Sequence, residues 1–378
     1  MSVGGVEVGK SPAAETPAAD TRAAITCRHL WKVFGEHARP RLEKARAEPV
    51  GDSAAVAEAL AAQGLVPAVR DVSFDVSRGE LFVVMGLSGS GKSTLVRCIS
   101  NLVQGTSGEI LIDGENVLGM GRKRLIELRR HKIGMVFQHF GLFPHMTVLE
   151  NVAFPLKMQG KTARARKERA AEVIELVGLS GREGAYPREL SGGQRQRVGL
   201  ARSLSVNPDI WFLDEPFSAL DPLIRRQLQD EFLKLQAGLA KTIVFITHDI
   251  AEALKLADRI AIMKDGEIVQ IGTPTEIVLN PANAYVAEFS RDVPKGRHAH
   301  LRHLMHTGRP FPAEMPDDPG LTTEMTVEAA LAQCLRRREN APVWNAARSE
   351  IVGYVHPGDL AAALDAAPDS GTTDRGGS

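Results

Sequence analysis

The stretch GLSGSGKST at residues 86–94 constrains the fold of this chain more than any other part of the sequence. It satisfies the pattern G-x-x-x-x-G-K-[ST], it follows the apolar run LFVVM, and the residues after it can continue as a helix. The pattern therefore predicts a buried strand, a phosphate-binding loop and a helix, in that order. A glycine-rich turn with a chance lysine is the alternative, and the strand–loop–helix context disfavours it.

The residue types in this loop suit contact with phosphate groups. Its glycines let the backbone curl tightly where a Cβ atom would clash. Lys92 can reach the β- and γ-phosphates, and the hydroxyl of Ser93 suits Mg²⁺. The residues that we expect around the nucleotide phosphates are Gly86, Leu87, Ser88, Gly89, Ser90, Gly91, Lys92, Ser93 and Thr94.

A second motif, IWFLDEP at residues 210–216, places two carboxylates after four apolar residues. Asp214, at the carboxyl end of a predicted strand, can hold Mg²⁺ through water. Glu215 follows it and can polarise an attacking water as a general base. An acidic pair that caps the next helix is the alternative, but a phosphate-binding loop in the same chain favours the catalytic interpretation.

Two more polar residues end predicted strands of the same sheet. His248 ends TIVFITH, where a structural hydrogen bond is the alternative to a contact with the γ-phosphate that helps to orient Glu215. Gln138 ends KIGMVFQ and is weak evidence alone, but near such a site it can reach the metal or the water.

A second phosphate cradle is predicted at ELSGGQRQRVGLARS, residues 189–203. Ser191, Gly192 and Gly193 open a helix and can point backbone N–H groups at an anion. This turn contains no lysine, and the chain already has a complete phosphate-binding loop. The stretch therefore raises the question of whose phosphate it contacts.

The remaining pattern predicts an α/β fold. Short apolar strands alternate with helices, which indicates a mostly parallel sheet covered on both faces. A helical subdomain at about 139–205 interrupts this alternation. Residues 36–66 form an inserted, partly helical excursion, with Asp52 or Ser53 as its helix cap.

Composition excludes several classes of protein. Lys and Arg (46) balance Asp and Glu (46), and no base-stacking aromatics accompany the basic runs, so we predict no nucleic-acid partner. The three cysteines are scattered without metal or disulfide spacing, which fits a reducing compartment. No apolar run approaches a membrane helix, so we expect a soluble, cytoplasmic chain.

The order of these motifs resembles the nucleotide-binding domain of ABC (ATP-binding cassette) transporters over residues 24–290. The resemblance implies a P-loop NTPase fold, with a RecA-like core and a helical subdomain, that hydrolyses ATP with Mg²⁺. It implies Mg²⁺ ligation by Ser93, Gln138 and Asp214. It also implies an aromatic that stacks on adenine, for which Phe34 matches and Trp31 is the alternative.

Longer stretches, among them IGMVFQHFGLFPHMTVLENVAF and GTPTEIVLNPANAYVAEF, resemble the ATPase subunits of quaternary-amine importers. The resemblance implies import of glycine betaine, proline betaine, proline or choline. Its implied partners are transmembrane permease subunits and, indirectly, a substrate-binding protein. It places the chain peripherally on the cytoplasmic face of the inner membrane. Such subunits do not select the solute.

The resemblance also answers the question of the second cradle. In this family two cassettes pack head to tail, so each ATP lies between two chains of a homodimer. The residues implied to contact the ATP of the partner subunit are Ser191, Gly192, Gly193, Gln194 and Asp221.

The segments outside residues 24–290 are less informative. We expect disorder in 1–23 and 366–378, and a linker at 291–325. Residues 326–365 resemble a single CBS-like repeat of small α/β type, with Thr326 as a helix cap. Four histidines within HAHLRHLMH, at 298, 300, 303 and 306, form either a metal site or, as we favour, a solvated polar linker.

Two other functions stay open at this stage. A soluble ABC protein that acts on nucleic acid or ribosomes would usually carry two cassettes or a long coiled-coil insertion, and this chain shows neither. In a ligand-gated sensor, the C-terminal repeat would bind the ligand and control the cassette.

Overall fold

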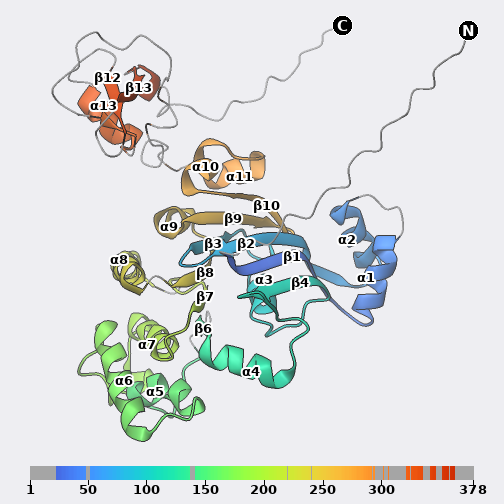
Figure 1. The fold of residues 1–378 in the computed structure, drawn as a ribbon, viewed down its shortest axis with the longest axis vertical. Coiled ribbons are helices and arrows are strands. Elements are labelled where there is room, and N and C mark those ends of the chain that lie inside the picture. Colours follow the sequence, from blue (N-terminus) through green and yellow to red (C-terminus); the bar gives the residue numbers. More distant parts are fainter. Residues whose placement is uncertain are drawn as a thin grey trace, which may run out of the picture.

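A six-stranded sheet forms the centre of the molecule, in the order β10-β9-β3-β8-β7-β6 (Figure 1). In this computed structural model the described residues are 23–47, 52–136, 141–218, 220–239, 241–291, 293, 301, 305, 321–323, 325–334, 341–345, 351–356 and 358–361. The predictions for Gln138, for the four clustered histidines and for both termini lie outside these residues.

The central sheet is parallel except for β10, which pairs antiparallel with β9. Its strands are β3 (Leu81–Met85), β6 (Ile133–Val136), β7 (Ile210–Asp214), β8 (Thr242–Thr247), β9 (Arg259–Lys264) and β10 (Glu267–Gly272). Every residue of β3, β7 and β8 is buried, as parallel strands with both faces covered require. The predicted parallel sheet is therefore confirmed.

A second sheet, which the sequence pattern did not separate from the first, is antiparallel with the order β2-β1-β4-β5. Its strands are β1 (Ala23–Phe34), β2 (Val66–Ser77), β4 (Ser107–Ile112) and β5 (Glu115–Asn116). Along β2, Val72, Phe74 and Val76 are buried while the residues between them face outward. Helix α3 (Lys92–Ile99) contributes Leu95 and Val96 to the same core cluster, so it packs against this sheet and one face of the central sheet.

The other face of the central sheet carries a second core cluster that includes the helical subdomain. Its helices are α5 (Val148–Met158), α6 (Ala163–Leu176) and α7 (Gly192–Ser205). Thr147 and Thr162 cap α5 and α6 through their side chains. Ala170, Val173 and Ile174 are fully buried, so this face of α6 packs into the core. The remaining helices of the cassette are α4 (Arg122–His131), α8 (Pro222–Leu239), α9 (Ile250–Leu256), α10 (Pro274–Leu279) and α11 (Ala284–Phe289).

The insertion forms two helices, α1 (Ala38–Ala47) and α2 (Ser53–Ala61), that pack on the end of β1 (Figure 1). Asp52 is the cap of α2, since its carboxylate accepts hydrogen bonds from the N–H groups of Ala54 and Ala55. Leu42 and Leu60 are fully buried in a cluster with Trp31. The insertion therefore has its own small core and covers one side of the strand that ends at Phe34.

The C-terminal segment has a separate core. It contains the helix α13 (Val327–Cys334) and the strands β11 (Leu321–Thr322), β12 (Ala341–Trp344) and β13 (Ile351–Val355). The three strands form a sheet in the order β11-β12-β13. The hydroxyl of Thr326 accepts from the N–H of Ala329, as expected of a helix cap. Leu301, in the segment expected to be a linker, is buried in this core. The assignment of a CBS-like repeat stays a prediction.

Candidate active site

The predicted phosphate and carboxylate residues meet at one edge of the central sheet. Met85, the last residue of β3, pairs with Thr247 at the end of β8, and Asp214 at the end of β7 pairs with Ile246. Because these strands are parallel, the phosphate-binding loop, Glu215 and His248 all leave the sheet on the same side. The arrangement expected from the sequence is therefore present.

The phosphate-binding loop requires glycine at two positions. Gly86 has a φ of +157°, and a Cβ atom there would lie 2.3 Å from the carbonyl oxygen of Met263. Gly91 has a φ of +99°, and its Cβ would lie 2.4 Å from the carbonyl oxygen of Ala68. Neither position can accept a side chain without moving backbone. By contrast, Leu87 at the loop tip is 57% exposed, so the loop presents its outer rim to a ligand.

Lys92 lies inside the loop with 6% of its surface exposed. Its ammonium group donates to the carbonyl oxygens of Gly86 and Leu87, both at 2.8 Å. Burial lowers the pKa of Lys92, and the nearby carboxylates of Glu215 and Asp214 act in the opposite direction. A phosphate group would replace these neutral carbonyl acceptors with negatively charged oxygens, which form stronger hydrogen bonds with a buried ammonium group.

Ser93 and Asp214 form the expected pair for a magnesium ion. The Ser93 hydroxyl donates to Asp214 Oδ1 at 3.0 Å, and Asp214 is 2% exposed. Burial raises the pKa of this carboxyl, with the Ser93 hydrogen bond as the largest opposing influence. A hydroxyl and a carboxylate side by side fit Mg²⁺, which takes few protein ligands and completes its shell with water and phosphate oxygens.

We expect an Asp214→Asn variant to be more stable without ligand than the native protein. Because the folded pKa of Asp214 lies above its ordinary value of 3.8, the group favours folding most at low pH. That contribution is lost as pH rises through the folded pKa, where the charged carboxylate is buried. Asparagine removes the charge and can still accept from Ser93. Thermal melts at about pH 8 test this expectation, since asparagine cannot carry the destabilising charge there.

The same variant should lose most of the rise in Tm that ATP with Mg²⁺ gives the native protein. Ser218→Ala, which removes an exposed hydroxyl that donates to the carbonyl of Glu215, is the matched control. An Asp214→Asn chain that melts below the native protein without ligand, yet keeps the full Mg²⁺-dependent rise, would contradict the assignment.

Glu215 and His248 form the second pair at this edge. His248 Nδ1 lies 3.2 Å from Glu215 Oε1, and the Glu215 side chain is 17% exposed. Glu215 has a φ of +47°, an unfavourable conformation for a residue with a side chain, and its N–H donates to the carbonyl of Ile246 at 3.1 Å. The pair can orient a water molecule and accept its proton.

The SGGQ turn begins α7 with a capping box. Ser191 Oγ accepts from the N–H of Gln194 at 3.2 Å, and the N–H of Ser191 donates to Gln194 Oε1 at 2.9 Å. These bonds use the first and last N–H groups of the turn, while those of Gly192 and Gly193 lie between them in the first helical turn. Such groups have no partner within a helix, so they are the donors that this turn offers to an anion.

This turn does not belong to the phosphate-binding loop of its own chain. Val198 and Ala201 of α7 lie in the core cluster on one face of the central sheet, whereas Leu95 and Val96 of α3 lie in the cluster on the other face. Asp221 precedes α8 and accepts from the N–H of Leu223 at 3.2 Å. The structure thus brings one group of predicted site residues together at the sheet edge, while the SGGQ turn begins a helix that packs on the opposite face of the sheet from α3.

The two aromatic alternatives for adenine differ in burial. Phe34 is 41% exposed at the end of β1, with the Lys32 ammonium 4.5 Å from its ring centroid. Trp31 is 2% exposed and is covered by the insertion. Only Phe34 has a ring face available for stacking.

Sequence reasoning missed one polar connection next to the site. Arg225, in the first turn of α8, lies 3.3 Å from the carboxylate of Asp249, the residue after His248. The sequence shows only that Arg225 follows Asp221 closely and that the acidic helix cap Asp249 follows His248. No pattern in the sequence relates the positions of Arg225 and Asp249 to each other.

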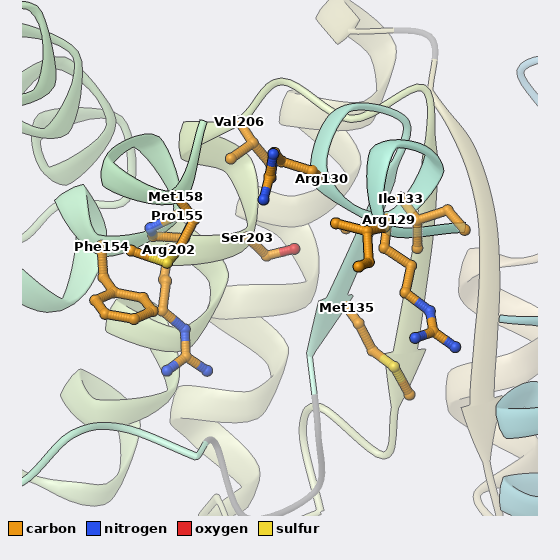
Figure 2. Close-up of a pocket in the computed structure, with 12 residues that line it drawn as sticks. Arg129, Arg130, Ile133, Met135, Phe154, Pro155, Met158, Arg202, Ser203 and Val206 are labelled. Carbon is orange, nitrogen blue, oxygen red and sulfur yellow. The ribbon is translucent and has the colours of Figure 1, made fainter. Parts of the chain in front are cut away.

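A groove of about 350 Å³ lies between the core and the helical subdomain (Figure 2). One wall comes from α4 and β6, and the other from α5 and α7. Its lining residues are Ile126, Arg129, Arg130, Ile133, Gly134, Met135, Phe154, Pro155, Met158, Arg202, Ser203 and Val206. Burial lowers the pKa of Arg129 and of Arg202. Both side chains donate to backbone carbonyl oxygens, Arg129 to those of Ser100 and Asn101 and Arg202 to that of Gly141.

Comparisons with known proteins agree with this geometry. The family model described as "ABC transporter" matches residues 69–218. The "Trimethylamine N-oxide transport system ATP-binding protein TmoW" of Ruegeria pomeroyi is 59% identical over 284 residues, which cover 75% of this chain and 82% of the relative. The TmoW protein of Pelagibacter ubique is 51% identical over 336 residues, covering 89% and 96%.

Another relative is the "Glycine betaine/proline betaine transport system ATP-binding protein ProV" of Salmonella typhimurium, 51% identical over 71% of this chain and 66% of its own length. Among solved structures, the dimeric ATP-binding cassette MJ0796 bound to ADP and Pi matches with a TM-score of 0.55 and 32% identity, covering 66% of this chain and 98% of that one. Among the residues that the structure describes, no helix is long and apolar enough to cross a membrane.

Proposed function

Because the chain belongs to the ATP-binding proteins of ABC transport systems, we propose that it hydrolyses ATP between two of its copies and so powers uptake of a small methylated amine. The observation that carries the proposal is the convergence of Lys92, the Ser93–Asp214 pair and the Glu215–His248 pair at one sheet edge. Groups suited to phosphate, metal and water meet there, while the SGGQ turn begins a helix that packs on the opposite face of the sheet from α3.

Each pair has a distinct task in hydrolysis. Lys92 and the N–H groups of its loop bind the phosphates and stabilise the charge that grows on them during transfer. Ser93 and Asp214 would hold Mg²⁺, which when bound neutralises the phosphate oxygens. Glu215 polarises the attacking water, and His248 holds the Glu215 carboxylate in place. Phe34 stacks on the adenine base.

The second cradle completes the site of a partner copy. Ser191, Gly192, Gly193 and Gln194 would donate to the γ-phosphate of the ATP that the partner binds, and Asp221 would lie at the same interface. ATP then favours the closed dimer, because only that state makes both sets of contacts. Loss of the γ-phosphate removes the link and lets the dimer open. The solved cassette MJ0796, described as a dimer bound to ADP and Pi, supports this arrangement.

The solute class rests on the names of the relatives. They are transport proteins for trimethylamine N-oxide and for glycine betaine or proline betaine. These solutes share a compact methylated nitrogen, which is the chemistry that we propose for the cargo. The chain would energise uptake from the cytoplasmic face of the membrane, while its partners select the solute.

Reconstitution with the cognate membrane subunits and binding protein in liposomes tests this proposal. ATP inside the liposomes should drive uptake of radiolabelled trimethylamine N-oxide or glycine betaine, and a Glu215→Gln chain should not. Uptake of neither solute above that control would refute the solute class. Sedimentation of the chain with ribosomes or DNA, and not with membranes, would support the alternative of a soluble ABC protein.

We also propose that the groove of Figure 2 receives a short cytoplasmic segment of the membrane partner. Ile126 and Met158 are 39% and 45% exposed there, and methionine adapts its shape to an apolar partner. Arg129 and Arg202 line the groove and donate to neutral backbone carbonyls, so a carboxylate on that segment would be a stronger partner for them. The partner segment is therefore expected to be apolar with an acidic residue.

A Met158→Glu variant should keep the ATPase activity of the isolated chain but lose at least about tenfold in affinity for the membrane subunit, since a charge would be buried against apolar surface. Pull-down with the detergent-solubilised partner measures this effect. Leu176→Glu is the matched control, because Leu176 is 47% exposed on α6 and does not line the groove. Equal loss in both variants, or in neither, would contradict this docking site.

A further inference from the structure

One guanidinium group connects the two ends of the proposed composite site. Arg225 Nη2 donates to the carbonyl oxygen of Leu220 at 3.1 Å, and Arg225 Nη1 donates to Asp249 Oδ2 at 3.3 Å. The N–H of Arg225 also donates to the carbonyl of Asp221 at 2.9 Å. Leu220 and Asp221 form the loop that would face the ATP of the partner, whereas Asp249 is the neighbour of His248.

Asp249 is fixed on the other side of this connection. Its Oδ1 caps α9 by accepting from the N–H groups of Ala251 and Glu252 at 2.9 and 3.2 Å, which leaves Oδ2 for Arg225. The N–H of Asp249 donates to Thr247 Oγ1 at 3.0 Å. Because His248 lies between Thr247 and Asp249, a shift of Asp249 must move both His248 and the start of α9.

His248 in turn contacts the proposed general base, since its Nδ1 lies 3.2 Å from Glu215 Oε1. A continuous path of contacts thus runs from the loop at Asp221 through Arg225 and Asp249 to His248 and Glu215. The Nε atom of Arg225 is buried and has no hydrogen-bond partner among the described residues. The guanidinium therefore keeps one donor that it could use if the loop moves, without losing either of its present partners.

We propose that Arg225 is a positioning residue that couples the loop at Asp221 to His248, so that occupation of the partner's ATP site sets the geometry of hydrolysis in this chain's own site. The inference rests on the proposed composite dimer and adds a route by which its two sites communicate. A rigid two-pronged guanidinium suits this task, because it holds two acceptors in one plane and lysine cannot.

Steady-state ATPase assays of Arg225→Gln test the coupling. We expect kcat to fall about tenfold or more, since misplacing a catalytic group by about 1 Å costs on the order of a hundredfold. The Kd for ATP, measured on the isolated chain, should change by less than about twofold, because none of the hydrogen bonds and ion pairs described for Arg225 involves the phosphate-binding loop. The Hill coefficient for ATP should fall from above 1 in the native protein to about 1.

Two further variants separate positioning from general stability. Arg225→Lys keeps the charge but not the fork and should share the kinetic defect while the Tm stays near native. Asp249→Asn keeps the cap of α9, since asparagine is an equally good cap residue, but presents a poorer partner to Arg225. Combining Arg225→Gln with Asp249→Asn should add little to either defect, because both break the same contact. Arg226→Gln, an exposed neighbour on α8, is the matched control and should be native.

The outcomes distinguish this inference from the proposed function. A cooperative native protein whose Arg225→Gln variant keeps kcat and Hill coefficient would overturn the coupling alone. Fully additive defects in the double variant, or a kcat restored by Arg225→Lys, would also overturn it. A native protein with a Hill coefficient of about 1, together with a Glu215→Gln chain that stays monomeric with ATP, would refute the composite dimer itself.

Discussion

A Glu215→Gln variant is expected to bind ATP with Mg²⁺ and to accumulate as a stable dimer, while its ATP hydrolysis falls by about a hundredfold or more. Glutamine has the shape of glutamate but cannot accept the proton of the attacking water, and general bases contribute roughly 10²- to 10⁴-fold. The backbone geometry at this position should survive, because the N–H of Glu215 bonds to Ile246 whatever the side chain is. Without hydrolysis the γ-phosphate stays and continues to favour the closed state.

Phosphate release and light scattering measure the two halves of this expectation. Dimers should form with ATP and Mg²⁺ and not with ADP, since ADP lacks the group that the second cradle contacts. Glu168→Gln is the matched control, because Glu168 lies on α6 and pairs only with Arg164 of the same helix among the contacts described. A Glu215→Gln chain that hydrolyses ATP at the native rate, or that remains monomeric with ATP and Mg²⁺, would count against Glu215 as the base.

His248→Ala should reduce kcat without preventing the ATP-dependent dimer. His248 lies beside Glu215 and is more exposed, which fits a residue that orients the carboxylate and does not itself accept the proton. Measuring kcat and the dimer population of this variant together distinguishes orientation from nucleotide binding. A His248→Ala chain with native kcat would remove the histidine from the catalytic set.

The sequence could predict this sheet edge because its motifs are local and its strands are parallel. Lys92, Asp214 and His248 each follow a short apolar run, and parallel runs end at the same edge. Nothing in that reasoning depends on how distant segments pair. The same logic located the SGGQ turn and its helix, whose capping box is also local.

Features that depend on non-local packing could not be predicted. Phe34 and Trp31 are three residues apart in one strand, and only the docking of Leu42 and Leu60 shows which of them is buried. The antiparallel sheet arises because β1 pairs with β2 across the insertion. Arg225 of α8 contacts Asp249 at the start of α9, and no pattern in the sequence indicates that these two residues meet.

Two inactive variants are expected to restore hydrolysis when they form a dimer with each other. Lys92→Ala should disable the phosphate-binding loop of its own chain but leave the second cradle intact. Gly193→Glu should do the reverse, because a carboxylate at the cradle repels the triphosphate, while an acidic residue in the first turn of α7 is compatible with the helix. In the mixed dimer one composite site then contains an intact loop and an intact cradle.

The experiment and its control contain the same two substitutions and differ only in whether two chains or one chain carry them. Random pairing of an equal mixture makes about half of the dimers mixed, each with one intact site out of two, so about a quarter of native activity is expected if the sites act independently. Placing both changes in one chain and mixing it with native chain gives mixed dimers without any intact site, which is the matched control. Only the native dimers of that mixture should be active, so about a quarter of native activity is expected, whereas sites built from one chain alone would give about a half. If hydrolysis needs both sites, the mixture of Lys92→Ala and Gly193→Glu chains stays inactive. A second readout then applies: when both chains also carry Glu215→Gln and have different tags, they should still pull each other down with ATP. Failure of both readouts would mean that the SGGQ turn does not act on the ATP of a partner. Recovery would identify the turn as the missing half of a site whose lysine, Lys92, belongs to the other chain.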